Sequence, residues 1–149
     1  MQWPSTRSDC LRAIGHVLDE AGASHVQIEE DDTSLLVRYA TGRGDVELRY
    51  PSLYLDELLT EARSRRARGV SGLNAGYEQN LRVIGSEMDR NRGRSIRVRE
   101  HEESFGANFI SRDGLRVNNT YLPAAILSLI EVGARRRRES AEASASSLG

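Results

Sequence analysis

The sequence contains no lysine, so all 21 of its basic residues are arginine. Without a lysine, the chain cannot form a side-chain Schiff base or supply the lysine of a phosphate-binding loop. Two explanations fit the arginine bias. One is a codon bias of a GC-rich genome, which the even spread of most arginines favours; the other is recognition of phosphate or carboxylate groups.

Cysteine and long apolar runs are also scarce. Cys10 is the single cysteine, which excludes an intrachain disulfide and a cysteine-based metal cluster. The longest apolar run starts at Tyr121 and is shorter than the ~20 residues that cross a bilayer. The first residues lack the apolar core of a signal peptide. We therefore expect a cytoplasmic protein with no membrane segment.

Motifs for metal, nucleotide or acid–base chemistry are missing as well. The acidic run 29–32 lacks the ligand spacing of a calcium loop, and its expected role is to solvate a turn. The histidines His16, His25 and His101 form no metal-binding pair and are expected to face solvent, while Cys10 is expected to be a small packing residue. The sequence thus predicts no catalytic residue, no metal site and no cofactor, and a protein that is not an enzyme.

What the sequence does contain is an internal similarity. Residues 11–44 align with residues 81–114 at a constant offset of seventy, without a gap. Chance would give roughly two identities in such a window. The identical pairs are Leu11/Leu81, Arg12/Arg82, Ile14/Ile84, Gly15/Gly85, Asp19/Asp89, Glu30/Glu100, Ser34/Ser104 and Gly44/Gly114. The apolar positions between them match in phase, which indicates an internal duplication.

Hydrophobic periodicity predicts the elements of each copy. In the first copy, a helix capped by Ser8 ends at Gly22. Three alternating strands follow, around residues 26–28, 35–39 and 46–50, and the third ends at Pro51. A second helix starts at Ser52, with Leu55, Leu58, Leu59 and Ala62 as its apolar stripe.

The second copy repeats this order. We expect a helix over 77–88, strands over 95–100, 104–110 and 115–117, and a last helix that starts near Thr120. The predicted organisation is a first repeat over residues 1–72, a second over 73–138, and a disordered polar tail over 139–149. The fold class is α+β, an internally duplicated α-β-β-β-α unit. Its six strands form one antiparallel sheet or two facing sheets, packed against helices as a pseudo-twofold single globule.

The predicted last helix, residues 121–134, has Glu131 as its one charged residue. A helix that is apolar on nearly every face is buried on nearly every face. We expect one stripe in the core and the remainder in an interface, with Leu122, Ile126, Leu127 and Ile130 as partner-binding residues. This favours a homodimer that binds another protein.

The element order resembles that of type III secretion chaperones and of small bacterial regulators of the YbjN type. The resemblance is topological, covers residues 8–138 and rests on no signature residue. It implies a small dimeric module that binds protein, and it implies no site residue.

Clusters of arginine support an alternative function. Arg97 and Arg99 lie on a predicted strand with Arg94 just ahead of it, and together they could form a polyanion-binding face. Other arginines fall at predicted helix ends, where they oppose the helix dipole without any ligand. The sequence thus favours a non-enzymatic protein-binding, adaptor or chaperone-like module, with nucleic-acid binding as the alternative.

Overall fold

Three helices and six strands make up the part of the chain that the computed structural model describes, residues 1–67 and 76–122. The elements are α1 (Arg7–Ala21), β1 (Ser24–Glu30), β2 (Ser34–Thr41), β3 (Gly44–Pro51), α2 (Ser52–Ala67), α3 (Tyr77–Arg90), β4 (Arg94–Glu100), β5 (Phe105–Ile110) and β6 (Arg116–Tyr121). The α+β class predicted from the sequence is confirmed. We call α1 to α2 the N-terminal half and α3 to β6 the C-terminal half.

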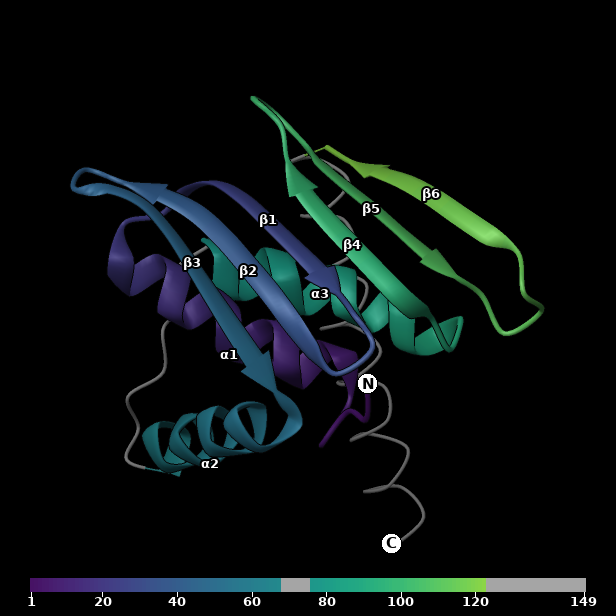
Figure 1. The fold of residues 1–149 in the computed structure, drawn as a ribbon, viewed down its shortest axis with the longest axis horizontal. Helices are drawn as coiled ribbons and strands as arrows, with labels where there is room; N and C mark the ends of the chain where they lie inside the picture. Colours follow the sequence, from purple (N-terminus) through teal and green to yellow (C-terminus); the bar gives the residue numbers. More distant parts are fainter. Residues whose placement is uncertain (68–75, 123–149) are drawn as a thin grey trace, which may run out of the picture.

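All six strands belong to one antiparallel sheet in the order β3-β2-β1-β4-β5-β6 (Figure 1). Each half supplies three consecutive strands, and the halves meet where β1 pairs with β4, with Ile28 opposite Val98. Of the two arrangements left open by the sequence, the single sheet is therefore correct, and two facing sheets are not formed.

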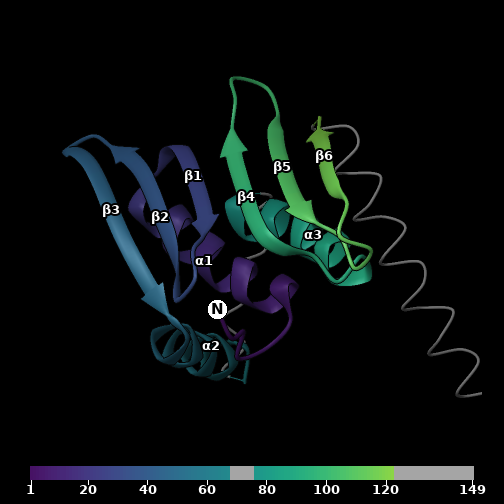
Figure 2. The ribbon, with the colours of Figure 1, turned by 45° about the vertical axis from the view of Figure 1, so that its right-hand side comes forward.

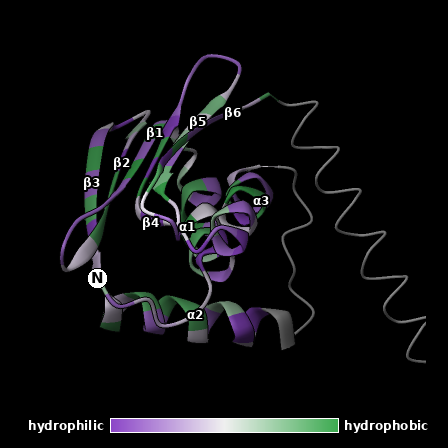
Figure 3. Ribbon diagram, turned by 90° about the vertical axis from the view of Figure 1, so that its right-hand side faces the viewer, coloured by the Kyte–Doolittle hydropathy of each residue, from purple (hydrophilic) through white to green (hydrophobic). Residues whose placement is uncertain are grey.

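The helices α1 and α3 pack against each other and cover one face of the sheet, called here the inner face (Figure 3). Strand alternation explains why this face is apolar. The buried positions of β1 and β4 follow the same pattern, with Val26 and Ile28 inward in one and Ile96 and Val98 inward in the other. Leu11, Ile14, Leu81 and Ile84 of the helices complete the core and are at most 1% exposed.

The two helices cross closely at glycines. A Cβ atom on Gly15 would lie 2.6 Å from the Tyr77 carbonyl oxygen, and one on Gly85 would lie 2.7 Å from the Ser8 Cα. Neither distance is compatible with a side chain. The shared glycine of the aligned segments is thus explained by close approach of the two helix backbones.

Each helix start is also held by a carboxylate of the other helix. Asp19 accepts the backbone N–H of Tyr77 at 2.8 Å, and Asp89 accepts the backbone N–H of Arg7 at 2.8 Å. The first N–H groups of a helix have no partner within the helix, so these carboxylates satisfy donors and oppose the helix dipole.

Two predicted boundaries are wrong. The cap of α1 is Thr6, whose hydroxyl accepts the Asp9 N–H at 3.1 Å, whereas the Ser8 hydroxyl donates to the Arg82 carbonyl of α3. The predicted helix start near Thr120 falls inside β6, because pairing with β5 continues to Tyr121. The rest of that helix, and the predicted polar tail 139–149, lie outside the described residues.

The predicted stripe of α2 is confirmed. Leu55 and Leu59 are buried, and Leu58 and Ala62 pack against the core. The helix follows β3 without a loop and packs against α1 beyond the end of the sheet (Figure 2). Among the helices described, none has the length and apolar character needed to cross a membrane.

Candidate functional site on the outer face of the sheet

No described helix covers the second face of the sheet, called here the outer face (Figure 3). Cross-strand pairing arranges its side chains in rows. In the N-terminal half the rows are Glu29/Leu36/Arg49, Gln27/Arg38/Glu47 and Ser24/Ala40/Asp45. In the C-terminal half they are Arg99/Gly106/Thr120, Arg97/Asn108/Asn118 and Arg94/Ile110/Arg116.

The three arginines predicted to form a polyanion face do share one face. Arg94 and Arg97 are three residues apart, and in a regular strand they would point to opposite sides. A bulge between them shifts the register, and Ser95 adopts a positive φ of 50°. As a result Arg94, Arg97 and Arg99 pair with consecutive outward residues of β5. The bulge is what aligns the three cations.

The two halves of the outer face differ in charge. The N-terminal rows carry three acidic and two basic residues, namely Glu29, Asp45, Glu47, Arg38 and Arg49. The C-terminal rows carry four basic residues and no acidic one, namely Arg94, Arg97, Arg99 and Arg116. The outer face is therefore cationic over β4, β5 and β6.

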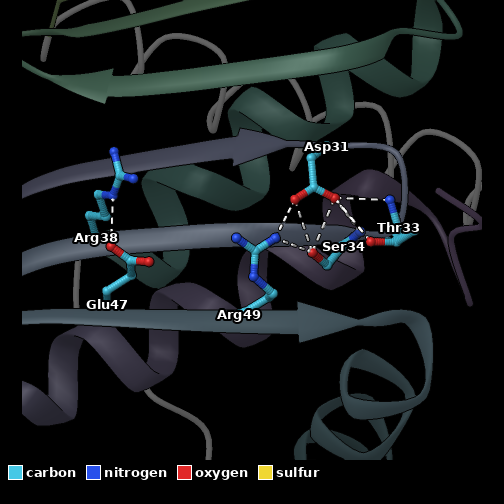
Figure 4. A network of polar contacts seen from close by, with 6 residues as sticks. All are labelled: Asp31, Thr33, Ser34, Arg38, Glu47 and Arg49. Atoms are coloured by element: carbon cyan, nitrogen blue, oxygen red, sulfur yellow. Dashed lines mark hydrogen bonds and ion pairs between the residues drawn. The ribbon is translucent and has the colours of Figure 1, made fainter.

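Ion pairs use several of these charges. Arg38 binds Glu47 at 3.1 Å across β2 and β3 (Figure 4), and Arg97 binds Glu29 at 3.3 Å across the junction of the halves. Arg116 donates to the Asn108 side chain at 3.0 Å. Within residues 1–67 and 76–122, no acidic side chain pairs with Arg99, whose strand neighbours are Gln27 and Gly106.

Two shallow depressions mark the outer face. One, of about 510 Å³, lies over β1, β2 and β3, and Arg38, Asp45 and Glu47 mix both charges in its lining. The other, of about 250 Å³, lies over β4, β5 and β6 and has no acidic residue in its lining. Its polar side chains are Arg97, Arg99, His101, Asn108, Asn118, Asn119 and Thr120.

The second half of the acidic run, Asp31 and Asp32, lies in the β1–β2 turn as predicted, whereas Glu29 and Glu30 still belong to β1 and pair with β2. Asp31 accepts the N–H groups of Thr33 at 2.9 Å and Ser34 at 2.8 Å, and it pairs with Arg49 of β3 (Figure 4). These hydrogen bonds, that from the Thr33 N–H first, hold the pKa of Asp31 well below its usual range. The described residues contain no group of three or more His, Cys, Asp or Glu placed to hold a metal ion.

The predictions for the histidines are confirmed for two of the three. His25 and His101 are exposed, but the side chain of His16 is only 16% exposed. His16 lies 2.9 Å from Glu20 and 3.6 Å from Glu78, and Glu78 also binds Arg12 at 3.1 Å. A charged cluster between α1 and α3, which helical spacing alone does not reveal, explains why His16 is not solvent-facing.

Cys10 is fully buried in the core, as expected of a packing residue. Burial raises the pKa of its thiol from 9.0 to about 12. A thiol that stays protonated and shielded is neither a nucleophile nor a metal ligand at neutral pH.

Of the predicted partner-binding residues, Leu122 lies within the described residues and is 56% exposed, just past the end of β6. Ile126, Leu127 and Ile130 lie outside them. Large exposed apolar side chains also occur at Leu53 and Tyr54 of α2 and at Leu115 in the β5–β6 turn. They are not part of either depression.

Sequence reasoning missed most of the cationic depression. His101 was expected only to face solvent, and Gly106, Asn108, Asn118 and Thr120 were not proposed as site residues. The alternation of Phe105, Ala107 and Phe109 nevertheless implies that Gly106 and Asn108 point outward. The residues of β6 were missed because the strand was predicted to stop at residue 117. Comparison of the chain with protein-family models, with curated proteins and with solved structures finds no match.

Proposed function

We propose that the chain is a non-enzymatic protein-binding module that presents the outer face of its sheet to a partner protein. The observation that carries the proposal is the charge separation on a face without a described cover, neutral-to-acidic over one half and cationic over the other. An open, wide and polar surface suits a protein partner better than it suits a small substrate, which proteins enclose in a concave apolar pocket. Charge complementarity then gives orientation and specificity.

We further propose that the two halves arose by internal duplication and are related by a pseudo-twofold axis between β1 and β4. Reciprocal contacts support this. The Ile96 N–H donates to Glu30 at 3.3 Å, and the Val26 N–H donates to Glu100 at 3.2 Å. Ile14 and Ile84 are both buried, and β1-β2-β3 and β4-β5-β6 run outward from the centre in the same order.

The homodimer and the cytoplasmic location expected from the sequence remain part of this proposal, together with the resemblance to type III secretion chaperones. Exposure of Leu122 beside the edge strand β6 supports a contact there. We expect a dimer at micromolar concentration by sedimentation, and a shift toward monomer, with the fold retained, for Leu127→Glu. A wild type that stays monomeric when concentrated would contradict the dimer.

Nucleic-acid binding is the second candidate, because Arg94, Arg97 and Arg99 are aligned on the outer face by the bulge. In that case binding should weaken steeply with salt, and Arg97→Ala with Arg99→Ala should flatten the slope.

Photo-crosslinking in the source cells distinguishes the two candidates. A photoreactive residue in place of Asn118, on the outer face, should form adducts with protein that protease degrades and nuclease leaves intact. The control places the same residue at Glu20 of α1, whose side chain is 70% exposed but lies on the helix layer. Adducts that nuclease degrades would favour the second candidate. Equal protein adducts from both positions would contradict a role for the outer face.

A further inference from the structure

We propose that the small hollow over Gly106, on the outer face of the C-terminal half, binds a carboxylate side chain of an acidic, extended segment of the partner protein. The inference rests on the proposed protein-binding function and adds the chemistry of the partner. The hollow is part of the cationic depression of about 250 Å³, whose lining includes Gly106.

The hollow exists because the central residue of its row has no side chain. Gly106 lies between Arg99 and Thr120 in register, so a guanidinium and a hydroxyl flank an open position. The ring of His101 bounds it from the adjoining turn, with Nε2 at 3.1 Å from where a Cβ on Gly106 would lie. Three polar donors or potential donors thus border the depression beside Gly106, and the His101 ring covers part of it.

The matching position of the N-terminal half shows what closes such a hollow. There the row is Glu29, Leu36 and Arg49, so a leucine side chain fills the centre. The adjoining turn carries Asp31, which pairs with Arg49 (Figure 4). An acid, a large apolar side chain and an internal ion pair occupy that site. Arg99, Gly106 and Thr120 replace all three features with an open, cationic arrangement.

The charge of the hollow is not neutralised within the described residues. Arg38, Arg49 and Arg97 each have an acidic partner. Arg99 has none there, and of the two arginines that line the depression it is the one paired in register with Gly106. An arginine binds a carboxylate through two parallel N–H···O hydrogen bonds, so an acidic side chain of a partner protein would pair with the Arg99 guanidinium in this way.

A protein segment fits this surface better than a nucleic acid does. The aromatic residues of the sheet all lie on the inner side: Tyr39, Phe105, Phe109 and Tyr121 are buried, and Tyr50 is half-buried against the core. None of them is placed on the outer face to stack on bases. The cationic area spans three strands, about 10 Å from the first to the third. Glu29 on β1 adjoins it, and Glu47 and Asp45 lie farther out on β3, so a phosphate backbone that continued across the face would meet acidic side chains.

The spacing of the arginines specifies the partner further. Arg97 and Arg99 are alternate residues of β4, so their side chains emerge about 6.6 Å apart. Alternate side chains of an extended peptide have the same spacing. A segment with an acid at every second residue can therefore place one carboxylate over Gly106 and the next beside the row Arg97, Asn108 and Asn118.

Fluorescence anisotropy with the full chain tests this inference. The probe is a fluorescein-labelled octapeptide of alternating Glu and Ser, and its control has Gln in place of Glu. We expect the Glu peptide to bind at least tenfold tighter, and Arg99→Gln to weaken its binding about tenfold, the scale of one lost charge-assisted hydrogen-bond pair. Gly106→Ala should weaken it several-fold by filling the hollow without a change of charge.

The matched control is Arg38→Gln, which removes an outward arginine from the N-terminal half and should change the affinity by less than about twofold. If Gly106→Ala proves to be unfolded by circular dichroism, Thr120→Val tests the same hollow from β6 and should also weaken binding. Equal affinity for the Gln peptide, or equal losses in Arg38→Gln and Arg99→Gln, would overturn the inference.

Two further arms separate other ligands. Inorganic phosphate that displaces the Glu peptide at equal concentration, or single-stranded RNA that binds more tightly than the peptide, would also overturn it. Protein crosslinks from position 118 without binding of the Glu peptide would reject the acidic segment but retain the protein-binding function. Tight binding of the Glu peptide without protein crosslinks would retain carboxylate binding at the hollow but reject the protein-binding function.

Discussion

At the scale of single residues, Asp31 and His101 give two similar turns of the sheet different chemistry. Both follow the first strand of a hairpin, and their N–H groups make the same turn hydrogen bond, to Ser34 at 2.9 Å and to Ser104 at 2.8 Å. Asp31 accepts from the turn and from Arg49, which closes its corner. His101 makes no such pairs among the described residues, and its ring instead borders the hollow.

The Asp31 network predicts a pH dependence of stability. Because its hydrogen bonds lower the pKa of Asp31 in the folded state, the carboxylate stabilises the fold above the unfolded pKa of about 4. This contribution is lost as the pH falls through the folded-state pKa. We expect Asp31→Asn to be less stable than the wild type at pH 7, with a smaller further loss between pH 5 and pH 2, measured by urea unfolding.

The matched control for this prediction is Asp32→Asn. Asp32 is the exposed neighbour in the same turn, so its variant carries the same charge change and should keep the wild-type pH profile. Parallel profiles for Asp31→Asn and the wild type would show that the turn network adds nothing to acid stability.

At the scale of elements, strand alternation and helical periodicity were sufficient to predict most of the fold. The three described helices, the first five strands and the glycine end of α1 follow from local sequence. The length of β6 does not, because Asn118 and Asn119 have weak strand propensity and the strand pairs only with β5. A tertiary contact overrides local preference at this strand.

The candidate site was predictable only in part, for a similar reason. Arg97 and Arg99 follow from alternation on β4. The alignment of Arg94 with them depends on a bulge, and a bulge is set by backbone geometry at Ser95 that no residue pattern announces. The hollow depends on Gly106 lying between two strands, which requires the register of β4, β5 and β6.

The helix crossing leads to a second prediction. A methyl group on Gly15 or Gly85 would clash with backbone atoms of the opposite helix, which cannot move as a flexible side chain can. Overpacking of this kind costs roughly 1–3 kcal/mol, more than the gain in helix propensity from glycine to alanine. We expect Gly15→Ala and Gly85→Ala to lower the unfolding free energy by similar amounts in urea titrations.

Gly42→Ala is the control for the crossing. Gly42 lies in the β2–β3 turn, where a Cβ atom would meet nothing within 4 Å and where φ is not positive. Its variant should stay within about 0.5 kcal/mol of the wild type. If Gly15→Ala greatly lowered the unfolding free energy and Gly85→Ala did not, the two helices would not contribute equivalently to stability, contrary to the proposed pseudo-twofold.

At the scale of the whole molecule, neither half can bury its own apolar surface. The N-terminal half without its partner would expose one edge of β1 and the face of α1 that carries Leu11 and Ile14. A single layer of three strands with so short a helical cover is marginal in water. The stability of the molecule therefore depends on the two contacts that join the halves, the β1–β4 junction and the α1–α3 packing.

This dependence can be tested by dividing the chain between residues 72 and 73. We expect residues 1–72 and 73–149, each produced alone, to lack cooperative thermal unfolding, and an equimolar mixture to regain it, because mixing restores the β1–β4 pairing and the crossing of α1 with α3. Circular dichroism and sedimentation measure both properties. A fragment 1–72 that instead pairs with itself would support the duplication, since two copies of one half would then replace the natural pair. A half that stays monomeric and unfolds cooperatively on its own would contradict the view that the two halves form one folding unit.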